Sequence, residues 1–383
     1  LVKETGFSPD REVATIFTWN VIEPKKGTFD WTLTDLAAKY ATKANAKLSA
    51  VIQPFASWDQ SGTSTAKNCQ AIDFAWYDNK PGAPKDIDEY KSFLTKTVER
   101  YKDNVAVWEI GNEYDSGCGG YQDNPQGYYD LVKVTSETIK KADPKAIVTN
   151  GGALEATGQD AISIKSFWTT FFSLRGNTYI DYFNLHYNVE RTPSAKLDIA
   201  NFQTDLDYFN NLMQANGGKK PIYITEFGIY SGNPADQPIG NPQPASNQKA
   251  LTELSQDRQA AEYLKYSVLA FANGTNKIFI DLVGPDKIII GSSAMFDEVG
   301  KARTFLTTLK LINQKLAGFT KAEKITDGQY KFTVNSKPVY VLWSGKIPSE
   351  ISDSSEVTNY KSELTNKKPS ETTLDNNQPI IIE

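Results

Sequence analysis

Short apolar runs alternate with amphipathic segments from the start of the chain to about residue 317. The apolar runs have the length and the β-branched and aromatic content of buried strands. The amphipathic segments repeat their apolar residues at the 3.6-residue period of a helix. The predicted strands cover residues 12–19, 47–54, 106–110, 146–150, 182–187, 221–226 and 277–283. The predicted helices cover residues 32–44, 88–102, 125–141, 164–174, 200–215, 256–272 and 299–317.

Regular alternation of strand and helix predicts right-handed βαβ units and a parallel sheet. Seven or eight such units predict an α/β protein with a closed (β/α)8 TIM barrel. The pattern yields seven strands, and residues 1–6 resemble the end of a helix. We therefore expect the first strand to be missing from this chain and to lie upstream of Leu1; the alternative is a strand that the pattern does not reveal.

The pattern changes after Gly318. Residues 330–335 and 338–343 alternate as in a hairpin, with the turn near Ser336–Lys337. A polar stretch follows at 349–378, and the chain closes with an apolar Pro-Ile-Ile-Ile run. The sequence thus predicts two domains, a catalytic barrel over 1–317 and a small C-terminal β-sandwich over 318–383.

Two of the predicted strands lead to glutamates, Glu113 and Glu226. A carboxylate is costly to desolvate, so a buried strand that delivers one to a pocket indicates a function. The carboxyl ends of barrel strands share one face, where active sites lie. Paired carboxylates that flank one bond are the machinery of glycoside hydrolysis. Glu109 points to the same side of its strand as Glu113, and we expect it in the barrel interior, paired with a cation or a hydroxyl.

Composition narrows the function classes. The net charge is −5 with a pI near 5.3, and no basic stripe is present, which argues against nucleic-acid binding. No apolar run is long enough to span a membrane. One histidine, His186, and two cysteines cannot supply a zinc or di-iron site. Nucleotide-binding glycine loops and a Gly-x-Ser-x-Gly elbow are also missing from the sequence. We expect neither a metal nor a cofactor.

The strand-end residues together resemble a known family. Asn112-Glu113 follows the strand at 106–110, His186-Tyr187 ends the strand at 182–187, and Thr225-Glu226-Phe227-Gly228 ends the strand at 221–226. In this order they resemble the clan A retaining glycoside hydrolases. Trp19-Asn20-Val21-Ile22-Glu23-Pro24 also resembles a strand-two signature of that clan. The C-terminal segment is similar to the appended β-domain of the β-xylosidase and endoglycosidase branches.

The resemblance implies roles for these residues. Glu226 would be the nucleophile, and Glu113 the acid and later the base. Asn112 would bind the sugar 2-hydroxyl, and His186 or Tyr187 would bond the nucleophile or the sugar. Further substrate contacts are expected from residues that follow other strands, with core packing as the alternative for the tryptophans: Trp19, Asn20, Trp58, Asp59 and Tyr230.

The chain departs from the clan pattern at two places. Many members carry an arginine on strand two, and the segment 14–19 has none. Many members end strand eight with a tryptophan that forms the floor of the sugar-binding site, and the segment 278–283 has no tryptophan. The resemblance therefore does not transfer sugar specificity. The proline-rich segment 229–247 begins beside Glu226 and is expected to form one wall of the cleft.

Cys69 and Cys118 follow neighbouring predicted strands, so their loops are expected to rise from one rim of the barrel. We predict a disulfide between them, which implies an extracellular or exported protein; two free thiols are the alternative. The leading function is a retaining β-glycosidase whose partner is a carbohydrate. A carbohydrate-binding pseudoenzyme is the alternative. An aldolase is a third reading, but it would need a lysine at a strand end, and no predicted strand ends in one. The sequence does not indicate the oligomeric state.

Overall fold

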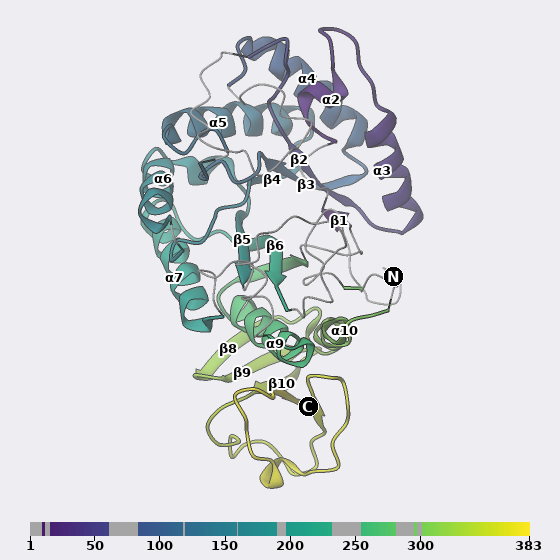
Figure 1. Ribbon diagram of the computed structural model, residues 1–383, viewed down its shortest axis with the longest axis vertical. Coiled ribbons are helices and arrows are strands. Elements are labelled where there is room, and N and C mark those ends of the chain that lie inside the picture. Colours follow the sequence, from purple (N-terminus) through teal and green to yellow (C-terminus); the bar gives the residue numbers. More distant parts are fainter. Residues whose placement is uncertain are drawn as a thin grey trace. The chain divides into compact units, whose positions relative to one another are not determined.

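The computed structural model describes residues 10–11, 16–60, 83–117, 119–158, 160–189, 197–231, 254–280, 295–296 and 301–383. Along these residues, strands and helices alternate as the sequence predicts (Figure 1). Four strands form a sheet in the order β1-β2-β3-β4, and three form a sheet in the order β5-β6-β7. Their bounds are β1 Asp10–Arg11, β2 Leu48–Ile52, β3 Val105–Ile110, β4 Ile147–Asn150, β5 Phe183–Val189, β6 Ile222–Ile229 and β7 Thr275–Ile280.

The strands lie side by side in the order of the chain. β1, β2, β3 and β4 pair in parallel with their neighbours. Two isolated parallel bridges, Thr149 to Tyr182 and Ala153 to Leu185, continue this order from β4 to the start of β5. Sequential parallel strands joined by helices are the arrangement of a (β/α) barrel. The strand expected upstream of Leu1 stays a prediction.

Seven helices of twelve residues or more appear among the described residues. They are α3 Thr32–Lys43, α4 Ile87–Tyr101, α5 Pro125–Ala142, α6 Ala161–Ser173, α7 Ile199–Ala215, α9 Gln256–Ala272 and α10 Thr304–Leu316. Three short helices are α2 Trp19–Ile22, η1 Gly176–Tyr179 and η4 Pro369–Glu371. No helix among the described residues is long and apolar enough to cross a membrane.

The helix ends follow from local sequence. Asp86 precedes α4 and accepts hydrogen bonds from the backbone N–H groups of Asp88 and Glu89, which have no partner inside the helix. Asn124 does the same at α5 by accepting from Gly127 N, and Pro125 occupies the first turn, where its missing N–H is no loss. Each cap fixes where the chain turns from a loop at the carboxyl edge of the sheet into a helix.

The chain divides into two compact units. The first unit comprises Ser8–Tyr187 and Thr204–Glu226. In it α3, α4, α5 and α6 follow one another around the outside of β2, β3 and β4 (Figure 1). The second unit comprises Leu1–Phe7, Asn188–Gln203 and Phe227–Glu383. The predicted domain boundary between residues 317 and 318 does not coincide with this division, and it stays a prediction.

An antiparallel sheet makes up the C-terminal part of the second unit. Its strands are β8 Lys321–Thr326, β9 Gln329–Val334, β10 Lys337–Leu342, β11 Val357–Asn359 and β12 Ile380–Ile382, in the order β11-β12-β10-β9-β8. Tyr340, Leu342 and Val357 form a core with Ile380 and Ile382, so the apolar run that ends the chain is buried. The described residues after 317 form one sheet, and the second layer of the predicted β-sandwich stays a prediction.

Two sequence predictions need correction. The hairpin turn lies at Asn335–Ser336, one residue earlier than predicted, because Lys337 pairs with Val334. Asn335 and Ser336 have φ values of 50° and 65°, as both central residues of a type I′ turn require. The strand predicted at 12–19 does not reach Trp19, which begins helix α2. Residues 12–15 of that strand and 281–283 of the last predicted barrel strand lie outside the described residues.

Candidate active site

Glu113 stands three residues beyond β3, on a backbone that turns sharply. Gly111 and Glu113 have φ values of 81° and 50°, in the left-handed region that few residues other than glycine adopt. The Glu113 N–H donates to the Gly151 carbonyl at 2.6 Å, which ties the loop after β3 to the end of β4. The side chain is 27% exposed. The local strain therefore holds a partly open carboxyl at the carboxyl edge of the sheet.

Glu113 and Glu226 meet at His186, and all three belong to the first unit. His186 Nδ1 lies 2.9 Å from Glu113 Oε1 and 3.6 Å from Glu226 Oε2. One oxygen of each carboxyl and the ring nitrogen all lie within 4.8 Å of one another. The ring is fully buried, whereas the Glu226 side chain is 17% exposed. The pairing of two carboxyls that sequence spacing predicts is therefore present.

Two glycines after β4 make room for this cluster. A Cβ on Gly152 would lie 2.1 Å from His186 Nε2, and Gly152 has a φ of 71°. A Cβ on Gly151 would lie 2.3 Å from the Gly111 backbone. No real Cβ contact is so short, so each position needs glycine. The Gly-Gly pair lets the chain pass directly beside the histidine ring and the glutamate loop.

Glu109 lies fully buried beneath the cluster and accepts several hydrogen bonds. Ser49 Oγ donates to its Oε1 at 2.7 Å, and Asn184 Nδ2 donates to its Oε2 at 3.0 Å. Thr225 Oγ1 lies 3.1 Å from the same Oε2. The expectation that Glu109 pairs with a hydroxyl in the interior is confirmed. Such multiple donors are what make a buried carboxylate tolerable.

Asp115 is a second buried carboxyl near the pair. Its Oδ2 accepts from Trp168 Nε1 at 2.7 Å and from the Leu154 N–H at 2.9 Å. Burial raises the pKa of Asp115 to about 7. The charge of Glu113 also raises this pKa, whereas the two hydrogen bonds lower it. Asp115 therefore gains or loses its proton in the neutral pH range, close to the candidate catalytic carboxyls.

Trp19 packs in the core of the first unit, and Asn20 binds a neighbouring loop. Trp19 is fully buried and stacks on Phe93 with ring centroids 5.6 Å apart. Its Nε1 donates to Glu23 at 2.7 Å. Asn20 Oδ1 accepts from the N–H and the hydroxyl of Ser57, so it holds the loop after β2. For Trp19 this placement favours core packing, which the sequence left open beside sugar contact.

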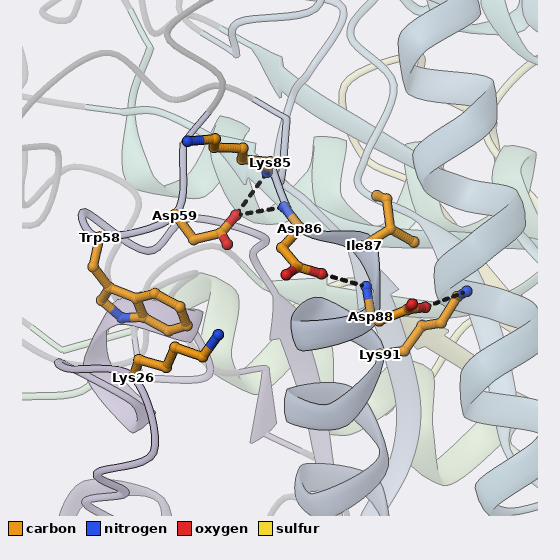
Figure 2. Close-up of a pocket in the computed structure, with 8 residues that line it drawn as sticks. All are labelled: Lys26, Trp58, Asp59, Lys85, Asp86, Ile87, Asp88 and Lys91. Carbon is orange, nitrogen blue, oxygen red and sulfur yellow. Dashed lines mark hydrogen bonds and ion pairs between the residues drawn. The ribbon is translucent and has the colours of Figure 1, made fainter.

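Trp58 and Asp59 line a surface pocket in the first unit (Figure 2). The other lining residues are Lys26, Lys85, Asp86, Ile87, Asp88 and Lys91. Asp59 Oδ1 accepts from the N–H groups of Lys85 and Asp86 at 2.6 and 3.0 Å, as Figure 2 shows. Trp58 Nε1 donates to the Glu23 carbonyl at 2.8 Å. Trp58 is half-buried and keeps part of its ring open to the pocket, whereas Asp59 is bound to the backbone before α4.

The remaining predicted site residues take varied positions. Asn112 is half-buried and adjoins Glu113, and Tyr187 is buried next to His186 in β5. Tyr230 is fully buried in the second unit, where its N–H donates to the Val189 carbonyl at 2.9 Å. Three parts of the predicted site lie outside the described residues: Cys69, Cys118 and residues 232–247 of the predicted cleft wall.

Several residues that build the site were not predicted from the sequence. Thr225 directly precedes Glu226, Asn184 lies two residues before His186 on the same strand face, and Asp115 lies two residues after Glu113. Their closeness to the named residues, and the period of two along a strand, are signals that could have found them. The Gly151-Gly152 pair at a predicted strand end is a further signal, since adjacent glycines there mark a close approach of backbone.

Metal ligands need His, Cys, Asp or Glu side chains that lie close together. Within the described part of the chain, one group of three meets this condition, namely Glu113, His186 and Glu226. The 2.9 Å separation of His186 Nδ1 and Glu113 Oε1 is that of a direct hydrogen bond. The ring nitrogen and the carboxyl are thus partners of each other. The geometry suits the exchange of a proton between them.

The fold is shared with solved glycoside hydrolases. A family 39 glycoside hydrolase from the gut symbiont Bacteroides cellulosilyticus is 16% identical, with a TM-score of 0.66 over 100% of this chain and 76% of that chain. A family 39 β-xylosidase from Caulobacter crescentus is 14% identical, with a TM-score of 0.65 over 100% of this chain and 89% of that chain. Xylanase 10B from Thermotoga maritima is 16% identical, with a TM-score of 0.51 over 79% and 85%.

No sequence-family profile matches the chain. At these identities the likeness concerns the fold. The resemblance to clan A retaining glycosidases, predicted from the strand-end motifs, is confirmed at that level. The chain has the α/β fold of the family 39 and family 10 glycoside hydrolases.

Proposed function

We propose that the chain is a retaining glycoside hydrolase that cleaves β-glycosidic bonds of an oligosaccharide or polysaccharide by double displacement. The observation that carries the proposal is the approach of the Glu113 and Glu226 carboxyls to within 4.8 Å, oxygen to oxygen. Retaining enzymes hold their carboxyl groups about 5–5.5 Å apart, whereas inverting enzymes leave about 6.5–9.5 Å for a water molecule. The short separation supports the retaining chemistry.

In the first step Glu226 attacks the anomeric carbon while the glycosidic C–O bond breaks. Glu113 gives its proton to the leaving oxygen, and a glycosyl ester on Glu226 results. In the second step water attacks the same carbon, Glu113 takes the proton of that water, and Glu226 leaves. The 27% exposure of Glu113 gives it access to a leaving group and then to water. Asn112, beside Glu113, would bind the sugar 2-hydroxyl.

The substrate class is proposed from the structural neighbours, among which are a β-xylosidase and an endo-β-1,4-xylanase. β-Xylosides and xylan are therefore the first substrates to test, followed by other aryl β-glycosides. The predicted Cys69–Cys118 pairing supports the further proposal of an exported protein, where polymeric sugars are met.

The assignment of roles can be tested with azide as an external nucleophile on an activated aryl β-glycoside. In Glu226→Ala, azide attacks the sugar directly and should give a glycosyl azide of inverted configuration. In Glu113→Ala, azide should attack the glycosyl-enzyme and give a retained product, because Glu226 still reacts first. Glu99→Ala, an exposed position on α4, is the matched control and should keep full activity.

The two azide products distinguish the possible outcomes. An exchange of the two stereochemical results between the variants would reverse the roles of the glutamates. Binding of xylo-oligosaccharides without turnover by the unaltered protein would instead support the carbohydrate-binding pseudoenzyme. Activity above a few per cent in Glu226→Ala without azide would remove Glu226 as the nucleophile.

A further inference from the structure

A continuous set of hydrogen bonds leads from the buried Glu109 to the candidate catalytic pair. Glu109 Oε2 lies 3.1 Å from Thr225 Oγ1, and Thr225 Oγ1 lies 3.0 Å from His186 Nε2. The other ring nitrogen, Nδ1, lies 2.9 Å from Glu113 Oε1. All four residues belong to the first unit. The set therefore joins a carboxylate without solvent access to a carboxyl that is open to substrate.

The Thr225 hydroxyl has one hydrogen and two acceptors for it. Glu109 Oε2 lies at 3.1 Å, and Asn184 Oδ1 lies at 2.9 Å. The orientation of the Asn184 amide is fixed, because its Nδ2 donates to Glu109 and its Oδ1 accepts the Thr225 N–H at 3.2 Å. Both neighbours of the hydroxyl are thus acceptors. The Thr225 hydrogen points to one of them, and the hydroxyl oxygen is left to accept from His186.

This arrangement decides which ring nitrogen of His186 carries a fixed hydrogen. Nε2 faces the accepting hydroxyl of Thr225, so Nε2 is the donor. The opposite tautomer would turn the Thr225 hydrogen toward Nε2 and away from both buried acceptors, the Glu109 carboxylate and the Asn184 amide oxygen. Ring flipping is also restricted, because Gly152 lies directly against the Nε2 edge of the ring.

We propose that Thr225, held by Glu109 and Asn184, keeps His186 protonated on Nε2, so that Nδ1 is the position at which the ring exchanges a proton with Glu113. The proposal deepens the proposed function, on which the catalytic meaning of the exchange rests. Thr225 and Glu109 act as positioning residues. A neutral ring of this tautomer accepts the proton of Glu113, and a charged ring donates to the Glu113 carboxylate.

Among the described residues, the titratable groups around the ring are few. Glu113 and Glu226 face Nδ1, and the 3.6 Å distance from Nδ1 to Glu226 is too long for a hydrogen bond. The buried Asp115 lies close enough to act on the ring through its charge when it is ionised. Glu109 lies one hydrogen bond farther, behind Thr225. Glu113 is therefore the direct proton partner of Nδ1. The exchanged proton stays between Nδ1 and the Glu113 carboxyl, and Glu226 stays available for attack.

The chain offers a direct test, because His186 is its one histidine. In protein labelled with nitrogen-15 histidine, a long-range proton–nitrogen spectrum shows one ring and needs no assignment. We expect Nε2 to have the chemical shift of a protonated nitrogen at every pH of the folded protein, and Nδ1 to change with pH. An unprotonated Nε2 in the unaltered protein would overturn the proposal, whatever the protein's enzymatic activity.

Two variants at Thr225 extend the test. Thr225→Ser keeps the hydroxyl and should keep the spectrum. Thr225→Val removes the acceptor, so the ring should move its hydrogen to Nδ1, facing Glu113, and Nε2 should take the shift of an unprotonated nitrogen. Thr97→Val, a buried threonine on α4, is the matched control and should leave the spectrum unchanged. A Thr225→Val spectrum equal to that of the unaltered protein would overturn the proposal.

Kinetics on an aryl β-glycoside provide a second readout. Thr225→Val should lower kcat by about tenfold with little change in KM, a fraction of the roughly 10²–10⁴-fold that general acid–base catalysis contributes. It should also shift the pH limbs of kcat/KM, and Thr225→Ser should restore both. An equal loss at every pH, with an unmoved limb, would indicate a merely structural role and contradict the proposal. No turnover by the unaltered protein would end the proposed function and leave the spectroscopic result standing.

Discussion

Asp115 makes the stability of the fold depend on pH in a direction opposite to that of most aspartates. Its carboxyl is fully buried, and burial raises its pKa from 3.8 to about 7. Between these two values the folded protein holds a proton on Asp115 that the unfolded chain has released. The free energy of unfolding therefore falls as pH rises through this window, and the contribution of this proton is complete only below about pH 4.

The magnitude follows from the shift. One pKa unit corresponds to about 1.4 kcal/mol, so a shift of about three units amounts to roughly 4 kcal/mol over the whole window. Between about pH 4.5 and pH 6.5 the change is about 2.5 kcal/mol by the same relation. Asp115→Asn carries no titrating group but keeps an oxygen that can accept from Trp168 and Leu154. The unaltered protein should lose about 2.5 kcal/mol relative to this variant as pH rises across that range.

The assay is urea denaturation of both proteins at several pH values, with the free energy of unfolding extrapolated to water at each. Other titrating groups are common to both proteins and cancel in the difference. Asp30→Asn is the control: hydrogen bonds from Thr32 keep the pKa of Asp30 below 3.8, so it is charged throughout the range and its curve should run parallel to that of the unaltered protein. Parallel curves for Asp115→Asn, within about 0.5 kcal/mol, would refute a neutral buried Asp115.

Three further predictions concern the site and its surroundings. Gly152→Ala should reduce kcat by about 100-fold or more, because the added Cβ displaces the His186 ring. In the control Gly158→Ala the added Cβ meets no atom closer than 3.5 Å, so this variant should keep full activity. Equal activities of the two variants would contradict the packing argument. Dialysis against EDTA should leave hydrolysis of an aryl glycoside unchanged, and a loss that added divalent metal restores would refute the two-carboxylate mechanism. Thiol titration of the denatured, unreduced protein should find no thiol at Cys69 or Cys118, and two thiols would disprove the disulfide.

The sequence was sufficient where a signal is local. The helix predicted at 256–272 has the same bounds in the structure, because its apolar period and the Ser255 cap are both written in neighbouring residues. The two candidate catalytic carboxyls could be paired because each follows an apolar run, and parallel strands end at one edge of the sheet. Glu109 could be placed in the interior from its spacing to Glu113 alone.

The remaining features depend on contacts between distant parts of the chain. The apolar pattern around Trp19 is the same whether the strand continues or turns into α2, and the contact of Trp19 with Phe93 cannot be seen in the residues around it. The need for glycine at position 152 becomes visible only when the His186 ring is known to lie against it. The raised pKa of Asp115 likewise arises from burial that no residue next to it reports.

The hydrogen bonds of Asp59 have a consequence for how the chain can change its length. The residues on either side of the segment 61–82 are joined at its base, by the antiparallel bridge of Gln60 to Pro84 and by Asp59, which accepts from Lys85 and Asp86. Because this clamp fixes the ends, a doubling of the length between them adds only about 0.6 kcal/mol of closure entropy. Insertions or deletions between Gln60 and Pro84 should therefore leave the start of α4 in place. The same stem is a suitable place to graft a foreign peptide, such as a sugar-binding loop or an affinity tag.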